Sequence, residues 1–146
     1  MSTRRSQLPI VAITMGDAAG IGPEVIVKAS ALRPGTFDFS RPLVVGDVAA
    51  LTRTASQLGV ATEIRRLERV AEAEFRLGGI DCMSLDLIPD DLPLGQLSAA
   101  TGEASYRFIE KAVALAMAGE ADAICTAPPT SAALSRRIRE AASRAA

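Results

Sequence analysis

Short apolar runs alternate with amphipathic stretches along most of the chain. Compact apolar runs bounded by glycine or proline predict buried strands, and apolar positions repeating every three or four residues predict helices. The predicted strands cover residues 9–14, 42–45, 60–64, 80–83, 85–88 and 121–127, and the predicted helices cover 23–33, 48–58 and 101–118. This alternation predicts an α/β fold, a layered α/β/α domain with a largely parallel sheet.

Local signals mark the ends of two predicted helices. Asp47 is placed to cap the second helix, and Gly59 suits the position just after it. Gly119 is expected to end the helix that begins at Thr101. The face of that long helix predicted to pack in the core consists of Tyr106, Ile109, Val113 and Ala116.

The remaining segments are predicted from composition. Residues 89–97 hold two prolines and a glycine and are expected to form a loop. Thr130 is expected to cap a last helix with Leu134 and Ile138 inside, although residues 131–146 are an atypical tail of mostly Ala, Arg and Ser. We expect residues 1–146 to form one domain, because 49% hydrophobic and 23% charged residues are typical of a globular chain.

Charge and composition restrict the function classes. A net charge of −1 gives no basis for binding nucleic acid, and no apolar run reaches membrane-spanning length. Cys82 and Cys125 stand in apolar surroundings and are expected to be buried thiols of a cytoplasmic protein. The sequence contains no histidine, so no metal ligand set or catalytic triad that needs imidazole can come from this chain.

The segment between the first predicted strand and helix is the strongest candidate for chemistry. Gly16, Gly20 and Gly22 follow that strand, and Asp17 and Ile21 stand between them. Free amides at the start of a helix favour a phosphate or carboxylate, so the segment is a candidate cofactor- or substrate-binding loop. The spacing G-x-x-x-G-x-G matches neither G-x-G-x-x-G nor a P-loop. A plain tight turn remains the alternative.

Two side chains leave similar alternatives open. Asp17 suits a ribose hydroxyl, a metal, a substrate amine or simply a turn. Thr126 ends a predicted strand, where its hydroxyl would meet a substrate phosphate or have no special role.

Two blocks of sequence resemble one known family. Residues 13–24, ITMGDAAGIGPE, resemble the N-terminal signature of the 4-hydroxythreonine-4-phosphate dehydrogenase (PdxA) family. Their core is also similar to the G-D-G-I-G-P-E opening of isopropylmalate and isocitrate dehydrogenases, which share that fold. The second block, Leu94 to Ser98 with Thr101, Gly102 and the helix to Gly119, is similar to the family's segment before the strand at 122–128.

The resemblance implies an NAD-dependent, metal-requiring dehydrogenase. Its family oxidises and decarboxylates 4-phosphohydroxy-L-threonine in pyridoxal phosphate (vitamin B6) biosynthesis, in a cleft between two domains of a homodimer. A divalent metal held by histidines polarises the substrate hydroxyl. Relatives of the family oxidise other four-carbon acid phosphates, such as threonate or erythronate derivatives, or aromatic dihydrodiols.

The chain departs from the family pattern in ways that affect this expectation. Ala18 replaces the usual proline, and Thr130 and Ser131 replace the usual Asn-Lys. The Gly-His-Thr-Glu motif and the second domain with the metal histidines are absent, so the isopropylmalate-dehydrogenase-like fold is expected to be incomplete. We therefore expect a truncated or frame-shifted, inactive N-terminal portion. The alternative is a short, non-catalytic nucleotide- or phosphate-binding module.

Overall fold

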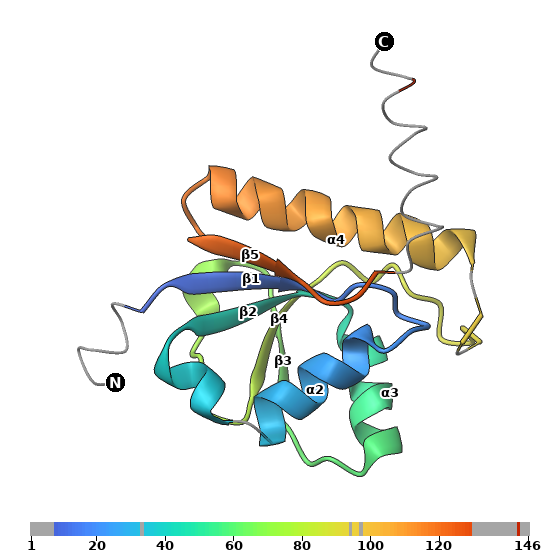
Figure 1. Ribbon diagram of the computed structural model, residues 1–146, viewed down its shortest axis with the longest axis horizontal. Coiled ribbons are helices and arrows are strands. Elements are labelled where there is room, and N and C mark those ends of the chain that lie inside the picture. The colour runs from blue at the N-terminus through green and yellow to red at the C-terminus, as the bar shows by residue number, and fades with distance from the viewer. Residues whose placement is uncertain (1–7, 33, 94, 97, 130–142, 144–146) are drawn as a thin grey trace.

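A computed structural model describes residues 8–129 and 143 of the chain, apart from residues 33, 94 and 97. Its centre is one five-stranded sheet with the order β3-β4-β2-β1-β5, in which every neighbouring pair is parallel (Figure 1). The predicted α/β fold with a parallel sheet is therefore confirmed. The strands are β1 (Ile10–Thr14), β2 (Arg41–Gly46), β3 (Ile64–Leu67), β4 (Ile80–Ser84) and β5 (Ala123–Thr126).

The helices form a layer on each face of the sheet. Helix α4 (Ala99–Met117) lies across β1, β2 and β5, whereas α2 (Gly22–Leu32) and α3 (Val48–Leu58) pack together on the opposite side (Figure 1). Two 3-10 turns, Pro34–Asp38 and Val70–Glu72, complete the connections. Such a division of helices is expected when parallel strands are joined by right-handed crossovers.

The apolar core lies between these layers. Strands β1 and β2 contribute Ala12, Leu43 and Val45, which are all fully buried. From the helices, Phe108 of α4 and Leu51 of α3 are also fully buried, one on each side of the sheet. Continuous apolar strands are needed in this fold because helices cover both faces of the sheet.

The predicted limits of α3 are confirmed. Asp47 precedes the helix and its carboxylate accepts a hydrogen bond of 3.0 Å from the amide of Ala50. Gly59 follows it with φ 64°, in the left-handed region that glycine adopts without strain. The second oxygen of Asp47 accepts from the amide of Ile88, so this cap also holds the loop after β4.

Two predicted strands are wrong in position or type. The strand predicted at 60–64 lies at Ile64–Leu67, because the amide of Val60 still bonds the Ala55 carbonyl at the end of α3. The segment 85–88 is a loop rather than a strand. Its Asp86 has φ 50°, a conformation that ends the extended backbone of β4.

Burial also differs from the predictions in β5 and α4. Strand β5 was predicted to be buried, but all four of its residues are exposed because it lies at the edge of the sheet, so Cys125 is exposed while Cys82 is buried. Helix α4 presents a different face to the core than predicted: Val113 is 45% exposed. The buried residues of α4 are Thr101, Gly102, Ala104, Ser105, Phe108, Ala112 and Leu115.

Two further predictions concern the C-terminal segment and membrane-spanning helices. The last helix and the tail at 131–146 lie outside the described residues. In the part of the chain that the structure describes, no helix is long and apolar enough to cross a membrane.

Candidate functional site

The candidate binding loop lies at the carboxyl end of β1. Residues 15–21, here called the β1–α2 loop, connect β1 to α2, with Gly22 as the first residue of the helix. Met15 is fully buried and Asp17 is 3% exposed, whereas Gly20 is exposed and Ile21 is 58% exposed. Only the tip of the loop, Gly20 and Ile21, is therefore open to a ligand.

Gly16 in the loop and Gly22 just after it are required by packing. Gly16 has φ 71°, and an added β-carbon would lie 2.7 Å from the carbonyl oxygens of Ala127 and Pro128. A β-carbon on Gly22 would lie 2.1 Å from the carbonyl oxygen of Met15. These distances are below any ordinary contact, so steric demand explains both glycines without a ligand.

Gly20 is different from the other two glycines. The three atoms nearest to an added β-carbon there all belong to Asp17, at 3.5 Å and beyond, which is ordinary van der Waals contact. Packing within the chain therefore does not explain a glycine at position 20. Glycine at an exposed loop tip allows another group to approach the backbone closely.

Asp17 shapes the loop. Its carboxylate accepts a hydrogen bond of 2.9 Å from the amide of Ala19, and its carbonyl accepts one of 3.0 Å from the amide of Gly20. This is the local pattern of an aspartate that forms a turn. Across the described residues, no group of three or more His, Cys, Asp and Glu side chains is placed to hold a metal ion. The described side chains therefore do not make a metal centre by themselves.

Three segments distant in sequence hold the loop from outside. The hydroxyl of Ser105 in α4 donates to the carbonyl of Gly16 over 2.8 Å, and this contact is buried. The amide of Gly95 donates to the carbonyl of Ala19 over 2.8 Å. On the third side, the amide of Asp17 donates to the carbonyl of Pro128 over 3.4 Å. The structure thus brings the two blocks of the family resemblance into direct contact.

Thr126 lies beside the base of this loop. It is paired in register with Thr14 across β1 and β5, and the amide of the next residue, Ala127, donates to the carbonyl of Thr14. Thr126 is exposed, whereas the Thr14 hydroxyl is buried and has no hydrogen-bond partner. The structure therefore places Thr126 at the same sheet edge as the β1–α2 loop, with a second threonine next to it.

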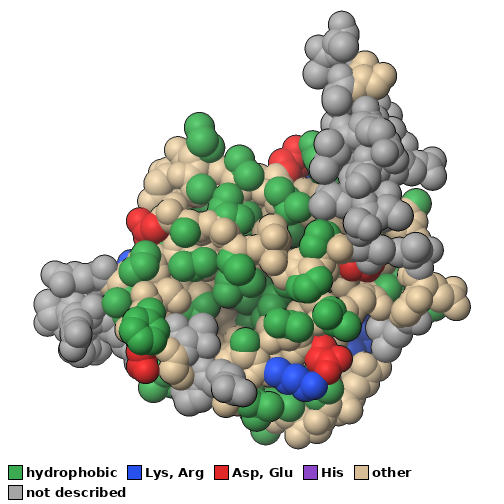
Figure 2. All heavy atoms as spheres, viewed as in Figure 1, with side chains coloured by type: hydrophobic (Ala, Val, Ile, Leu, Met, Phe, Trp, Pro, Cys, Tyr) green, Lys and Arg blue, Asp and Glu red, His purple; other side chains and the backbone are tan. Residues whose placement is uncertain are grey.

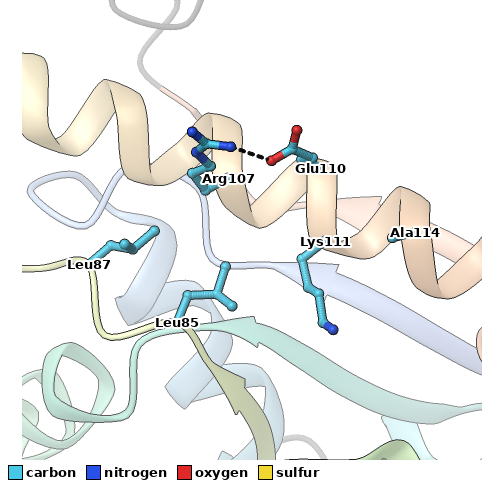
Figure 3. Close-up of a pocket in the computed structure, with 6 residues that line it drawn as sticks. All are labelled: Leu85, Leu87, Arg107, Glu110, Lys111 and Ala114. Atoms are coloured by element: carbon cyan, nitrogen blue, oxygen red, sulfur yellow. Dashed lines mark hydrogen bonds and ion pairs between the residues drawn. The ribbon is translucent and has the colours of Figure 1, made fainter.

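Two hollows lie near this edge of the sheet. One of about 340 Å³ touches the β1–α2 loop through Ala18 and is otherwise formed by α3 and the loop after β4. It is lined by Ala18, Ala50, Arg53, Thr54, Gln57, Asp90, Asp91 and Leu92. The other, of about 430 Å³, contains none of the predicted site residues. It lies between α4 and the loop after β4, with Leu85, Leu87 and Lys111 among its lining (Figure 3).

Apolar side chains also gather on the molecular surface. Figure 2 shows them across the middle of one face, over β5 and β1 and between α4 and α2. Ile124 of β5 is 39% exposed and Val25 of α2 is 45% exposed. This exposed area adjoins the edge strand, so β5 is shielded neither by charge nor by another strand among the described residues.

The charged residues near β3 are paired with one another. Arg66 binds both carboxylate oxygens of Asp86, whose other partner is the Ser84 hydroxyl. The Arg66 guanidinium, followed by that hydroxyl, lowers the pKa of Asp86. Arg65 similarly binds the buried Asp81. These arginines are therefore already neutralised, which leaves them poorly suited to a phosphate.

Sequence reasoning missed the residues that hold the loop from outside. Gly95 lies inside a block that resembles the PdxA family, so a signal for it was present. Ser105 and Pro128 also lie in segments that resemble the family, but nothing in the sequence pointed to their contacts with the loop, because these depend on how α4 and β5 pack against β1. A small polar residue on a buried helix face is the one local hint for Ser105.

Comparison with known proteins agrees with this geometry. The family model for "Pyridoxal phosphate biosynthetic protein PdxA" matches residues 38–142. A D-threonate 4-phosphate dehydrogenase of Cupriavidus necator is 50% identical over 121 residues, which are 83% of this chain and 36% of that protein. The chain thus spans about a third of that relative's length.

Solved structures give the same result. A 4-hydroxythreonine-4-phosphate dehydrogenase from Burkholderia phymatum is 52% identical with a TM-score of 0.84, covering 87% of this chain and 38% of that one. The enzyme of that name from Klebsiella pneumoniae is 37% identical with a TM-score of 0.79, covering 86% and 39%. Fold and loop together define the class: a parallel α/β domain of the kind found in these dehydrogenases. The chain belongs to the PdxA family.

Proposed function

We propose that this chain is the N-terminal portion of an NAD-dependent dehydrogenase that oxidises a phosphorylated four-carbon hydroxy acid. Family membership supports the class of reaction. The observation that carries the proposal is the tip of the β1–α2 loop, where exposed Gly20 has no packing reason to be glycine. Such a tip, at the carboxyl end of a parallel strand, is where this kind of sheet binds ligands.

We propose that this loop binds the cofactor or the substrate and not a metal. NAD accepts a hydride from the substrate when it is bound. The residues proposed for cofactor or substrate are Gly16, Asp17, Gly20, Ile21, Gly22 and Thr126; Gly20 and Ile21 would make the contact, and Gly16, Asp17 and Gly22 shape the backbone. The chain has no histidine, so we propose that a divalent metal of the family's reaction takes its ligands from other parts of the family's protein.

Two substrates are supported by similarity. The segment is 50% identical to a protein named for D-threonate 4-phosphate and 52% identical to one named for 4-hydroxythreonine 4-phosphate. Both are four-carbon acids with a terminal phosphate and adjacent hydroxyl or amino groups. We propose D-threonate 4-phosphate first and the pyridoxal phosphate precursor second, because the curated relative carries the first name.

The domain assignment rests on the same comparisons. We propose that residues 1–146 correspond to one N-terminal α/β domain within a longer two-domain, homodimeric family architecture. The family match extends to residue 142, into the segment rich in Ala, Arg and Ser. Because the match includes residues 131–142, it favours an in-frame family sequence there over an out-of-frame one.

Calorimetric titration of the 146-residue chain with NAD tests this function. We expect NAD to bind the wild type and not Gly20→Val, because a branched side chain at the tip blocks approach to the backbone. Gly35→Val is the matched control: Gly35 is also exposed and its β-carbon would meet only Asp38, at 3.7 Å. Equal affinity of the two variants for NAD would show that the loop is a turn without a role in binding.

A turnover assay separates binding from catalysis. With NAD, a divalent metal and D-threonate 4-phosphate, we expect no NADH from this chain alone, since it holds no histidine and no metal cluster among its described residues. Measurable NADH formation would show that metal ligation by histidine is not needed.

A further inference from the structure

We propose that Ser105 is a positioning residue that fixes the ligand-facing tip of the β1–α2 loop. The inference rests on the proposed function, because only that function gives the loop a ligand to bind. It assigns a functional consequence to α4, a helix whose side chains do not line the exposed tip.

The contact itself is well suited to this purpose. Ser105 is 2% exposed, and its hydroxyl donates to the Gly16 carbonyl over 2.8 Å across 89 residues of sequence. Gly16 has φ 71°, and glycine has a wider choice of backbone conformations than any other residue, so a hydrogen bond from outside the loop is needed to fix the direction of its carbonyl. Fixing that carbonyl fixes the start of the turn that Asp17 continues.

The other two contacts use the backbone alone: one binds the amide side of the same Gly16–Asp17 peptide group, and the other acts farther along the loop. Gly95 reaches the carbonyl of Ala19, and Pro128 reaches the amide of Asp17, both through the backbone. The Ser105 contact comes from a side chain, so a substitution removes it without altering the backbone of either partner. It holds the carbonyl side of the Gly16–Asp17 peptide group, whose amide side is held by Pro128, and this group sets the direction in which the chain continues toward Gly20 and Ile21.

Loss of the hydroxyl leaves a buried carbonyl without this donor. Such a group costs free energy until the chain moves to let it find water or another donor. The lowest-cost movement is in the loop, because Gly16 sits in a segment of small residues, whereas the facing part of α4 is held by Phe108 in the core. We therefore expect the tip to lose its fixed conformation while the sheet stays intact.

Hydrogen exchange on the full chain tests the positioning directly. In Ser105→Ala, the amides of Asp17, Ala19 and Gly20 should exchange about tenfold faster, because each is protected by a hydrogen bond within this loop or to its neighbours. Amides of Leu43 and Val45 in β2 should be unchanged. Ser105→Thr keeps the hydroxyl and should restore protection.

Thr54→Ala is the control variant, because it removes a hydroxyl that bonds only within its own helix, α3. It should leave the exchange of the loop amides unchanged. Unchanged loop exchange in Ser105→Ala would overturn the inference. Equal acceleration in the loop and in β2 would also overturn it, because that pattern is global destabilisation.

Titration with NAD provides the functional readout. The dissociation constant should rise about tenfold in Ser105→Ala, since the competent loop conformation is populated less, and should return in Ser105→Thr. Wild-type affinity in Ser105→Ala would contradict a positioning role toward the ligand. If the wild type itself does not bind NAD, the proposed function fails, and hydrogen exchange alone decides whether Ser105 positions the loop.

Discussion

The first residue of α2, Gly22, packs directly against the carbonyl of Met15, so that a β-carbon on Gly22 would lie 2.1 Å from that oxygen. The β1–α2 loop therefore leaves and re-enters the core at nearly the same point. Its width at the base is set by the absence of a side chain at Gly22, and only the tip is free to differ.

This contact predicts that substitutions at Gly22 and at Gly20 change the free energy of unfolding by very different amounts. Gly22→Ala should lower the free energy of unfolding by about 2–3 kcal/mol, because the backbone of Met15 must move. Gly20→Ala should change it by less than about 0.5 kcal/mol, since its β-carbon meets ordinary contacts. Urea unfolding of the two variants measures the difference. Similar losses in both would mean that the loop tolerates no side chain at all.

Thr14 predicts a stabilising substitution in the core. Its hydroxyl is buried without a partner, so Thr14→Val should raise the free energy of unfolding by about 1 kcal/mol. Thr101→Val is the comparison, because the Thr101 hydroxyl is also buried but donates to the carbonyl of Ser98. That variant should lose about 1 kcal/mol. Chemical denaturation is the measurement, and a destabilised Thr14→Val would show that the hydroxyl has a partner in solution.

The two thiols should react at different rates. Cys82 is fully buried, and burial followed by the charge of Asp47 raises its pKa to about 12, so little thiolate is present at pH 8. Cys125 lies exposed on β5. A chromogenic disulfide reagent should therefore modify one thiol rapidly in the folded chain and the second only on unfolding. Cys125→Ser should remove the rapid phase, and a rapid phase that persists would show that Cys82 is accessible in the folded chain.

Acidification should weaken the connection between β3 and the loop after β4. The pKa of Asp86 is lowered first by Arg66 and then by Ser84, so the stabilisation is present above the ordinary aspartate pKa of 3.8 and is lost as the pH falls through the lower, folded-state value. Asp86→Asn should flatten the loss of stability below about pH 4 while keeping the φ of 50°, which asparagine tolerates. Thermal melts across pH provide the test.

Salt is the control for that prediction. Arg66 and Asp86 are both about half exposed, so high salt should reduce the acid dependence of the wild type and leave Asp86→Asn nearly unaffected. If the wild type and Asp86→Asn lose stability equally in acid, other carboxylates are responsible for the loss.

The sequence predicted an element well where the bounds of that element are decided by residues next to them in the chain. Asp47 and Gly59 bounded α3 correctly because capping is decided by the backbone next to them. The strand at Ile64–Leu67 was displaced in the prediction because its two arginines look like surface residues until Asp81 of the neighbouring strand is placed beside Arg65.

The candidate site was predictable only in part, for the same reason. Glycine spacing after a strand marked the loop, and the structure puts that loop at the carboxyl edge with Thr126 nearby. Which glycine serves packing and which faces solvent depends on Met15, Ala127 and Pro128, whose positions follow from tertiary structure. The exposure of Cys125 likewise depends on which strand occupies the edge of the sheet.

The pairing of β1 with β5 has a consequence for the order in which the chain folds. Ile10 and Asp122 exchange hydrogen bonds across 112 positions, of 2.7 Å and 2.8 Å, so one side of β1 has its partner only after β5 has been synthesised. During translation, β1 and β2 can associate early, but α4 and β5 close over the β1–α2 loop late. One edge of β1 therefore stays unpaired until β5 has emerged, and the proposed ligand-facing turn acquires its full set of contacts only after Ser105 and Pro128 have been synthesised.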